Sequence, residues 1–181
     1  MPHNATVINH TKKWLRDVII AHTLCPFAKR EYDAGRIHYA VIESADLESQ
    51  LEQVILNCTA LDNDTSRETS LLIFPNTLSD FHEYLNLLDL ANALMKAEGY
   101  EGAYQLASFH PQYCFADAPP EDASNYTNRS PYPMLHILRE ASVEAALKSH
   151  PNPQNIPARN IAHTRELGLE AMRTILAACY E

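Results

Sequence analysis

His110 is the residue of this chain best placed, by type and position, to do chemistry. It follows the apolar run AYQLASF, and Pro111 restricts the backbone directly after it. An imidazole at the end of a strand can serve as a general base or as a metal ligand. We therefore treat His110 as a candidate catalytic residue. The competing interpretation is a histidine that only satisfies nearby backbone groups.

The segment that His110 opens, residues 110–133, contains five prolines and no glycine, and it has the pattern of neither helix nor strand. A connection of this length without secondary structure is usually either functional or disordered. Disordered segments are poor in aromatics, whereas this one carries Tyr113, Phe115, Tyr126 and Tyr132. We predict an ordered loop that builds a site.

His136, shortly after this loop, is the second candidate metal ligand. The proline that ends the loop suits the first turn of a helix, which predicts a helix over 133–149. On that helix His136 would share one side with Arg139 and Glu140. His110 and His136 could then hold a divalent transition metal if a carboxylate or thiolate joined them. No strong metal motif such as His-Glu-x-x-His is present, so the identity of any cofactor stays open.

Arg129 and Arg139 suggest recognition of an anion, because a guanidinium group binds a carboxylate or phosphate through paired hydrogen bonds. Arg129 stands between Asn128 and Ser130 in the proline-rich loop. We name these four residues as candidate contacts to a small anionic substrate. The alternative is that the arginines form salt bridges that fix the loop.

Cys25, in the run LCPFA, is the second candidate catalytic residue. If Pro26 begins a short helix, Cys25 is its cap, and the helix dipole would lower the pKa of the thiol. A thiolate there could be a nucleophile, a redox group or a soft metal ligand. The competing interpretation is a buried structural cysteine. The other cysteines, at 58, 114 and 179, are expected to be structural.

Several other chemistries are disfavoured by missing motifs. Four glycines, at 35, 99, 102 and 168, cannot form a glycine-rich phosphate loop, and the chain has no Gly-x-Ser-x-Gly elbow and no Cys-x-x-Cys. The segment RNIAHTRELG reads as mostly structural: His163 is expected on a helix, with Arg159 and Arg165 on its solvated face. Arg159 could alternatively reach the pocket.

Length and charge narrow the class of protein. A chain of 181 residues predicts a single domain, 1–181. The net charge of −9 and the lack of a basic run disfavour binding to nucleic acid or to an anionic membrane. No signal-peptide pattern and no apolar run long enough to span a bilayer is present, so we expect a cytoplasmic protein with reduced cysteines.

Apolar spacing predicts alternating helices and strands after an N-terminal helix over 5–23. Strands are expected at 37–43, 70–74 and 103–109. Helices are expected between these strands, the second with Thr77 or Ser79 as its N-cap. Two C-terminal helices, over 133–149 and 158–179, complete the chain.

This order predicts an α/β fold with a small three-stranded, mainly parallel βαβαβ sheet flanked by helices. The carboxyl ends of the strands would then lie at one edge, where open α/β sheets bind ligands, and His110 would emerge there. Glu68 would lie at the opposite edge and is not a catalytic candidate. The alternative is a ferredoxin-like α+β sandwich, which would reverse one strand.

Five blocks of sequence resemble a known family. They are Leu24–Ala28, Glu68–Pro75, Gln105–Ala116, Asn125–Glu140 and Ile156–Asn160. With the motifs LCPFA, SFHPQY and NYTNRSPYPMLHILRE, the chain is similar to an uncharacterised, mostly bacterial domain-of-unknown-function family. The resemblance covers nearly the whole chain and implies one domain. It implies no activity, cofactor or catalytic residue.

Two functions follow as hypotheses. The favoured one is a small cytosolic enzyme that acts on a small anionic molecule, with a pocket built from His110, Arg129, His136 and Cys25. With a metal, the histidines would ligate it; without one, His110 would be the general base and Cys25 the nucleophile. The alternative is a non-catalytic binding or interaction module that uses the loop over 110–133 as its partner surface. Neither the reaction class nor the oligomeric state follows from the sequence.

Overall fold

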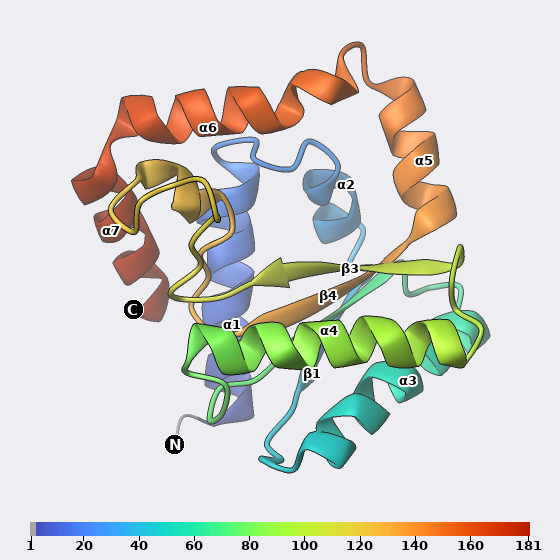
Figure 1. Cartoon of the computed structure of the whole chain (residues 1–181). Helices are drawn as coiled ribbons and strands as arrows, with labels where there is room; N and C mark the ends of the chain where they lie inside the picture. Colours follow the sequence, from blue (N-terminus) through green and yellow to red (C-terminus); the bar gives the residue numbers. More distant parts are fainter. Residues whose placement is uncertain (1–2) are drawn as a thin grey trace.

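The computed structural model describes residues 3–181 (Figure 1). Its helices and strands follow in the order α1 (Asn4–Trp14), α2 (Ala28–Asp33), β1 (Ile37–Val41), α3 (Leu47–Asn63), β2 (Thr69–Ile73), α4 (Phe81–Ala97), β3 (Tyr104–Phe109), β4 (Met134–Arg139), α5 (Glu140–Ser149), α6 (Ile156–Leu167) and α7 (Leu169–Ala177). A π-helical segment, Leu15–Ile20, continues α1. Short 3₁₀ turns cover Ala123–Thr127, Pro153–Asn155 and Ala178–Tyr180.

The strands of the described residues form one mixed sheet of four, in the order β1-β2-β4-β3. β1 and β2 are parallel, whereas β4 is antiparallel to both β2 and β3. The first three strands therefore run the same way, and their carboxyl ends share one edge, where Ile73 and Phe109 both pair with Met134. The prediction of three mainly parallel strands is nevertheless wrong, because two of the three pairings are antiparallel. The ferredoxin-like alternative is not formed either, because none of the first three strands is reversed.

Residues 134–139 are strand β4 and not part of a helix over 133–149. A short apolar run fits a strand or a buried helix equally well by pattern. In the fold this run lies between β2 and β3, which satisfy its backbone hydrogen bonds on both sides. Leu135 and Ile137 enter the core beneath one face of the sheet, and Met134 enters the core on the other. Only the second half of the predicted helix exists, as α5.

Helices cover both faces of the sheet (Figure 1). α3 and α4 pack on the face that carries Leu72 and Leu135. α1 packs on the face that carries Leu71 and Met134, and its Trp14 is almost completely buried there. Cys58 and Cys179 are fully buried in the two cores, in agreement with the structural role expected from their helical spacing.

Two helix boundaries differ from the prediction. Asp80, rather than Thr77 or Ser79, caps α4, because its carboxylate accepts hydrogen bonds from the backbone N–H groups of His82 and Glu83. The helix expected over 158–179 is divided into α6 and α7 at Gly168, where φ is +83°. None of the helices in residues 3–181 combines the length and the apolar character needed to cross a bilayer.

Candidate functional site

The loop over 110–133 is held by its own polar side chains. Asn125 is completely buried. Its Oδ1 accepts the N–H of Phe115 (3.0 Å), and its Nδ2 donates to the carbonyl of Pro119 (2.9 Å). Arg165 of α6 forms an ion pair with Asp122 of the loop (2.8 Å) and lowers the pKa of that carboxyl. Arg165 was expected on a solvated face of its helix, but this ion pair ties α6 to the loop.

His110 lies at the end of β3 but is fully buried against α4, with the rings of Phe81 and Tyr84 each 5.1 Å away between centroids. Nδ1 accepts the N–H of Gln112 (3.0 Å). Nε2 must therefore carry the proton that it donates to the carbonyl of Leu78 (2.9 Å). Burial lowers the pKa of His110 and keeps it neutral. Both nitrogens are engaged, which matches the competing structural interpretation of this residue.

His136 projects from the middle of β4, so it cannot share a helix side with Arg139 and Glu140 as predicted. The hydroxyl of Thr69 donates to the carbonyl of Ile137, so it accepts from Nε2 of His136 at 2.6 Å. Burial lowers the pKa of His136 to about 4. This histidine is a neutral residue that joins two strands.

His110 and His136 point into different cores and do not converge. His110 packs on Tyr84 beneath the α3–α4 face, whereas His136 lies beside Phe109, which packs in the α1 core. The geometry therefore does not support the metal site proposed for this pair. Within residues 3–181, no group of three or more His, Cys, Asp and Glu side chains could hold a metal ion.

Arg129 fixes the loop rather than facing an open site. Its Nε donates to the carbonyl of Tyr113 (3.1 Å), and a terminal nitrogen donates to the carbonyl of Pro120 (2.9 Å). Its guanidinium lies over the ring of Tyr126, 4.7 Å from the centroid. Its own carbonyl accepts the indole N–H of Trp14 (3.0 Å). The loop-fixing alternative is thus closer to the structure, although carbonyls replace the expected carboxylate.

Arg139 lies at the opposite edge of the sheet from Arg129, because it pairs with Tyr104 at the start of β3. It donates to the hydroxyl of Tyr104 (3.0 Å) and to the carbonyls of Leu61 and Arg67. The two arginines therefore do not form one anion site. Arg139 connects the sheet to the end of α3.

Asn128 and Ser130 have different surroundings although they flank Arg129. Ser130 is fully buried and donates to the carbonyl of Tyr132 (2.6 Å), which leaves it inside the loop. Asn128 donates to the carbonyl of Ser108 (3.0 Å) and lines a pocket.

Cys25 lines the same pocket, but it is not a helix cap. α2 begins at Ala28 with Phe27 as its N-cap, so the predicted helix at Pro26 is wrong. The residue is exposed. Protein around the thiol nevertheless desolvates its charged form and raises its pKa, an effect that the N–H groups of Phe27 and Ala28 oppose only in part. The thiol is therefore largely protonated at neutral pH, contrary to the expected thiolate.

The pocket, which we call the Cys25 pocket, has a volume of about 350 Å³. Four segments far apart in the sequence build it: the chain around Cys25, the end of β3, the loop over 110–133, and α6. Its walls are mostly apolar, with a thiol, a hydroxyl and two amides among the lining side chains, which are Ile19, Leu24, Cys25, Phe109, Phe115, Thr127, Asn128, Ile156, Pro157, Asn160 and Ile161.

α6 closes the pocket by holding the chain before Cys25. Asn160 donates to the carbonyl of Leu24 (2.6 Å), and Arg159 donates to the carbonyls of Thr23 (2.7 Å) and His22 (3.2 Å). Thr23 has a positive φ of 53°, a strained conformation for a β-branched residue. Such strain persists where surrounding contacts hold the backbone, often beside functional sites.

Asn160 was not among the predicted site residues, although it ends the block Ile156–Asn160. Its amide meets Leu24 across the pocket only because α6 folds back over the N-terminal helix, a contact that spans 136 residues of sequence. The resemblance of the block Ile156–Asn160 to the known family was the one sequence signal that could have identified Asn160. Arg159, considered as a residue that could reach the pocket, instead holds its wall.

Comparison with known proteins assigns most of the chain to one family. No curated protein and no solved structure matches it. A family model described as "Protein of unknown function (DUF1415)" matches residues 6–174, and the chain therefore belongs to this family.

Proposed function

We propose that this protein binds a small, uncharged and largely apolar molecule in the Cys25 pocket. The observation that carries this proposal is that segments far apart in the sequence converge on this pocket. Apart from Ile19 and Ile161, every lining residue belongs to one of four family-like blocks, Leu24–Ala28, Gln105–Ala116, Asn125–Glu140 and Ile156–Asn160. A concave, mostly apolar site with a few convergent polar groups is the usual form of a small-molecule site.

The chemistry of the lining argues for a neutral ligand. No charged side chain is among the residues that line the Cys25 pocket, and Arg129 and Arg139 donate to backbone carbonyls elsewhere. Asn128 and Asn160 each commit one amide N–H to a carbonyl of the protein. Their amide oxygens accept hydrogen bonds from the hydroxyl of Thr127 and from Arg159, so their second N–H groups are the amide donors that remain to orient a ligand. Because neither arginine is available in this pocket, the main reason for expecting an anionic substrate no longer holds.

Catalysis through Cys25 is the second candidate function. The N–H groups of Phe27 and Ala28 are directed at its sulfur and favour the thiolate. Burial acts against the thiolate and dominates, so the thiol would become a strong nucleophile only when a bound ligand or a base changes its surroundings. Without such a change, binding remains the better-supported function.

The loop over 110–133 is a weaker candidate for a partner surface. Tyr126 and Tyr132 are buried, and Tyr113 and Phe115 are half-buried. Its aromatic residues are thus used to fold the loop. We keep the expectation of a cytoplasmic protein that does not bind nucleic acid, since the chain carries a net charge of −9 and its four cysteines are free.

Two maleimides of matched reactivity test the proposed pocket. In a Cys114→Ser background, Cys25 is the accessible thiol, because Cys58 and Cys179 are buried. N-phenylmaleimide should modify Cys25 at least about tenfold faster than a maleimide that carries a carboxylate, as expected for an apolar pocket. Intact mass spectrometry measures both rates.

A variant that fills the pocket supplies the specific control. Ile156→Trp should abolish the preference for N-phenylmaleimide, whereas Ala162→Trp, at an exposed position of the same helix outside the lining, should keep it. Equal rates for the two reagents in the parent protein, or equal effects of the two tryptophans, would contradict an apolar binding pocket. Thermal unfolding confirms that each variant is folded.

A further inference from the structure

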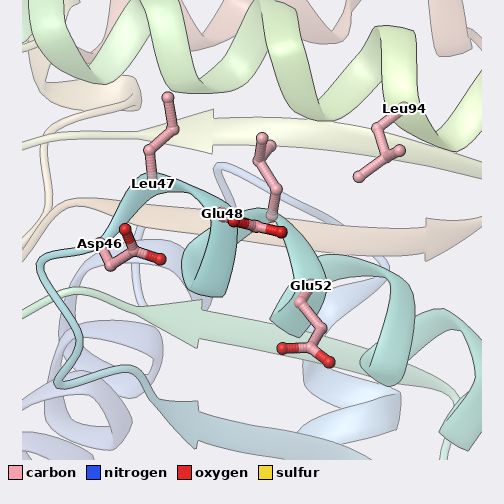
Figure 2. Close-up of a pocket in the computed structure, with 6 residues that line it drawn as sticks. Asp46, Leu47, Glu48, Glu52 and Leu94 are labelled. Carbon is pink, nitrogen blue, oxygen red and sulfur yellow. The ribbon is translucent and has the colours of Figure 1, made fainter.

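An apolar groove lies between α3 and α4 (Figure 2), on the face of the sheet opposite the core that contains Leu24 and Phe109 of the Cys25 pocket. It has a volume of about 560 Å³ and is lined by Asp46, Leu47, Glu48, Leu51, Glu52 and Leu94. Figure 2 shows Leu47 pointing from α3 toward α4 and Leu94 pointing from α4 toward α3. We call it the α3–α4 groove.

Large apolar side chains are exposed along this helical layer. Leu47 is 47% exposed, and Leu90, one turn before Leu94 on α4, is 45% exposed. Leu47 and Leu90 thus lie on two helices that pack against each other. Leu56 of α3 is exposed as well, but it follows Leu47 by nine residues, which places it on the opposite side of the helix and outside this surface. Clustered exposure of this kind marks an interaction surface more often than exposure of single residues does.

The surroundings of the groove are strongly acidic. α3 contains no Lys or Arg, and α4 contains only Lys96, which is paired with Glu101. The carboxylates of Asp46 and Glu52 lie along the α3 side of the groove in Figure 2. Within residues 3–181 neither Glu48 nor Glu52 forms an ion pair, although Glu144 of α5 and Glu170 of α7 both do.

We propose that the α3–α4 groove binds an amphipathic helix of another protein, one with leucine-like side chains on one face and Lys or Arg beside them. Leu47, Leu51 and Leu94 would receive apolar side chains spaced three or four residues apart, as in other helix-in-groove complexes. The free carboxylates of Glu48 and Glu52 would meet the basic residues and steer the approach. This proposal is independent of the Cys25 pocket.

Charge complementarity distinguishes this occupant from two others. A second copy of the chain in a symmetric contact would place the acidic rim against itself, because the same patch is used on both sides. An anionic membrane surface would be repelled by the same carboxylates. A basic helix satisfies both the apolar walls and the charge of the rim.

The test uses a fluorescently labelled amphipathic peptide of about 14 residues, long enough to form a helix when bound, made of Leu and Lys. A matched peptide has Glu in place of Lys. We expect the Leu/Lys peptide to bind and the Leu/Glu peptide not to bind, as measured by fluorescence anisotropy. Affinity should fall as salt is raised. Amide shifts of the labelled protein should map to α3 and α4.

Matched variants localise the binding. Leu47→Ser should weaken affinity for the Leu/Lys peptide about tenfold, the usual effect of losing a central apolar contact. Leu147→Ser, at an exposed leucine of α5, should leave it unchanged. Glu48→Gln combined with Glu52→Gln should weaken binding and flatten its salt dependence, whereas Glu144→Gln should not.

Three results would overturn the proposal. One is equal weakening by Leu47→Ser and Leu147→Ser, which would indicate nonspecific attraction to an acidic protein. A second is failure of the Leu/Lys peptide to shift amides in α3 and α4. The third is a concentration-dependent dimer that Leu47→Ser abolishes, seen by sedimentation, which would assign the groove to a second copy of the chain.

Discussion

The imidazole rings of His22 and His163 are in hydrogen-bond contact, with Nδ1 of His22 3.1 Å from Nε2 of His163. The contact joins the chain just before Cys25 to α6, beside the hydrogen bonds that Arg159 donates to the carbonyls of His22 and Thr23. One nitrogen of the pair must donate and the other must accept, so at least one ring is neutral. The wall of the Cys25 pocket is therefore held by a bond that acid can break.

The histidine pair should make the protein less stable in mild acid. Burial, and then the charge of His163, lower the pKa of His22. The folded state thus binds fewer protons than the unfolded state, and stability is lost as pH falls below about 6.5, the ordinary pKa of histidine. His163→Gln should reduce the loss between pH 7.5 and 5.5, as measured by urea unfolding.

His82→Gln is the matched control for this prediction, because the side chain of His82 is 90% exposed. It should leave the loss of stability between pH 7.5 and 5.5 unchanged. If His163→Gln behaves like His82→Gln, the histidine pair does not set the acid sensitivity. Amide hydrogen exchange would locate the effect. Amides near Cys25 should exchange faster at pH 5.5 than pH alone explains if the pocket wall opens there.

His136 should dominate acid unfolding at lower pH. Its pKa is lowered from 6.5 to about 4 by burial, so it contributes stability that is lost as pH falls from about 6.5 toward 4, up to roughly 3 kcal/mol. His136→Phe should cost about 1 kcal/mol at pH 7.5, for the lost hydrogen bond to Thr69. Near pH 4.5 the His136→Phe variant should be more stable than the parent protein. If the variant and the parent differed in stability by the same amount at both pH values, this role of His136 would be contradicted.

Arg129→Lys should loosen the loop over 110–133 although it conserves charge. Lysine cannot reproduce the planar group that bonds two carbonyls and lies over Tyr126. We expect a loss of about 1–3 kcal/mol in the free energy of unfolding and faster cleavage of the loop by a protease. Arg16→Lys, at an exposed ion pair with Asp17, should change neither. A fully stable Arg129→Lys variant would show that the loop is held by other contacts.

Cys25 should react slowly with iodoacetamide at neutral pH. Its pKa is raised because the protein around the sulfur desolvates the charged form, and the thiolate is the reactive form. In the Cys114→Ser background the alkylation rate should still be rising with pH above pH 9, as followed by intact mass. A plateau reached below pH 8 would instead indicate a thiolate, and would favour catalysis through Cys25 over simple binding.

The strand pattern was predictable from sequence to a large extent, because runs such as SLLIF are short, apolar and bounded by turn residues. β4 was not. Its run MLHILR is compatible with helix and strand, and the decision depended on the open edges of β2 and β3, which accept it as a central strand. The loop over 110–133 returns the chain to the edge it left, so β4 must run back antiparallel.

The candidate site was less predictable than the sheet. Types and spacing suggested a pocket of His110, Arg129 and His136, but side-chain direction cannot be obtained from spacing across a long loop. His110 turned toward α4, where Leu78 and Gln112 satisfy both of its nitrogens. Cys25 and Asn128 did enter one pocket, brought together by packing against α6.

The sequence by itself determined that the first three strands run in one direction, that the loop over 110–133 begins at their carboxyl edge, and that Cys25 and Asn160 belong to distinctive blocks. These features depend on local pattern and on the handedness of crossover connections. Only the tertiary structure decided the place of β4, the burial of His110 and the meeting of α6 with the chain around Cys25. Those outcomes depend on long-range packing and on which buried polar group finds which partner, and neither is encoded in any local stretch of sequence.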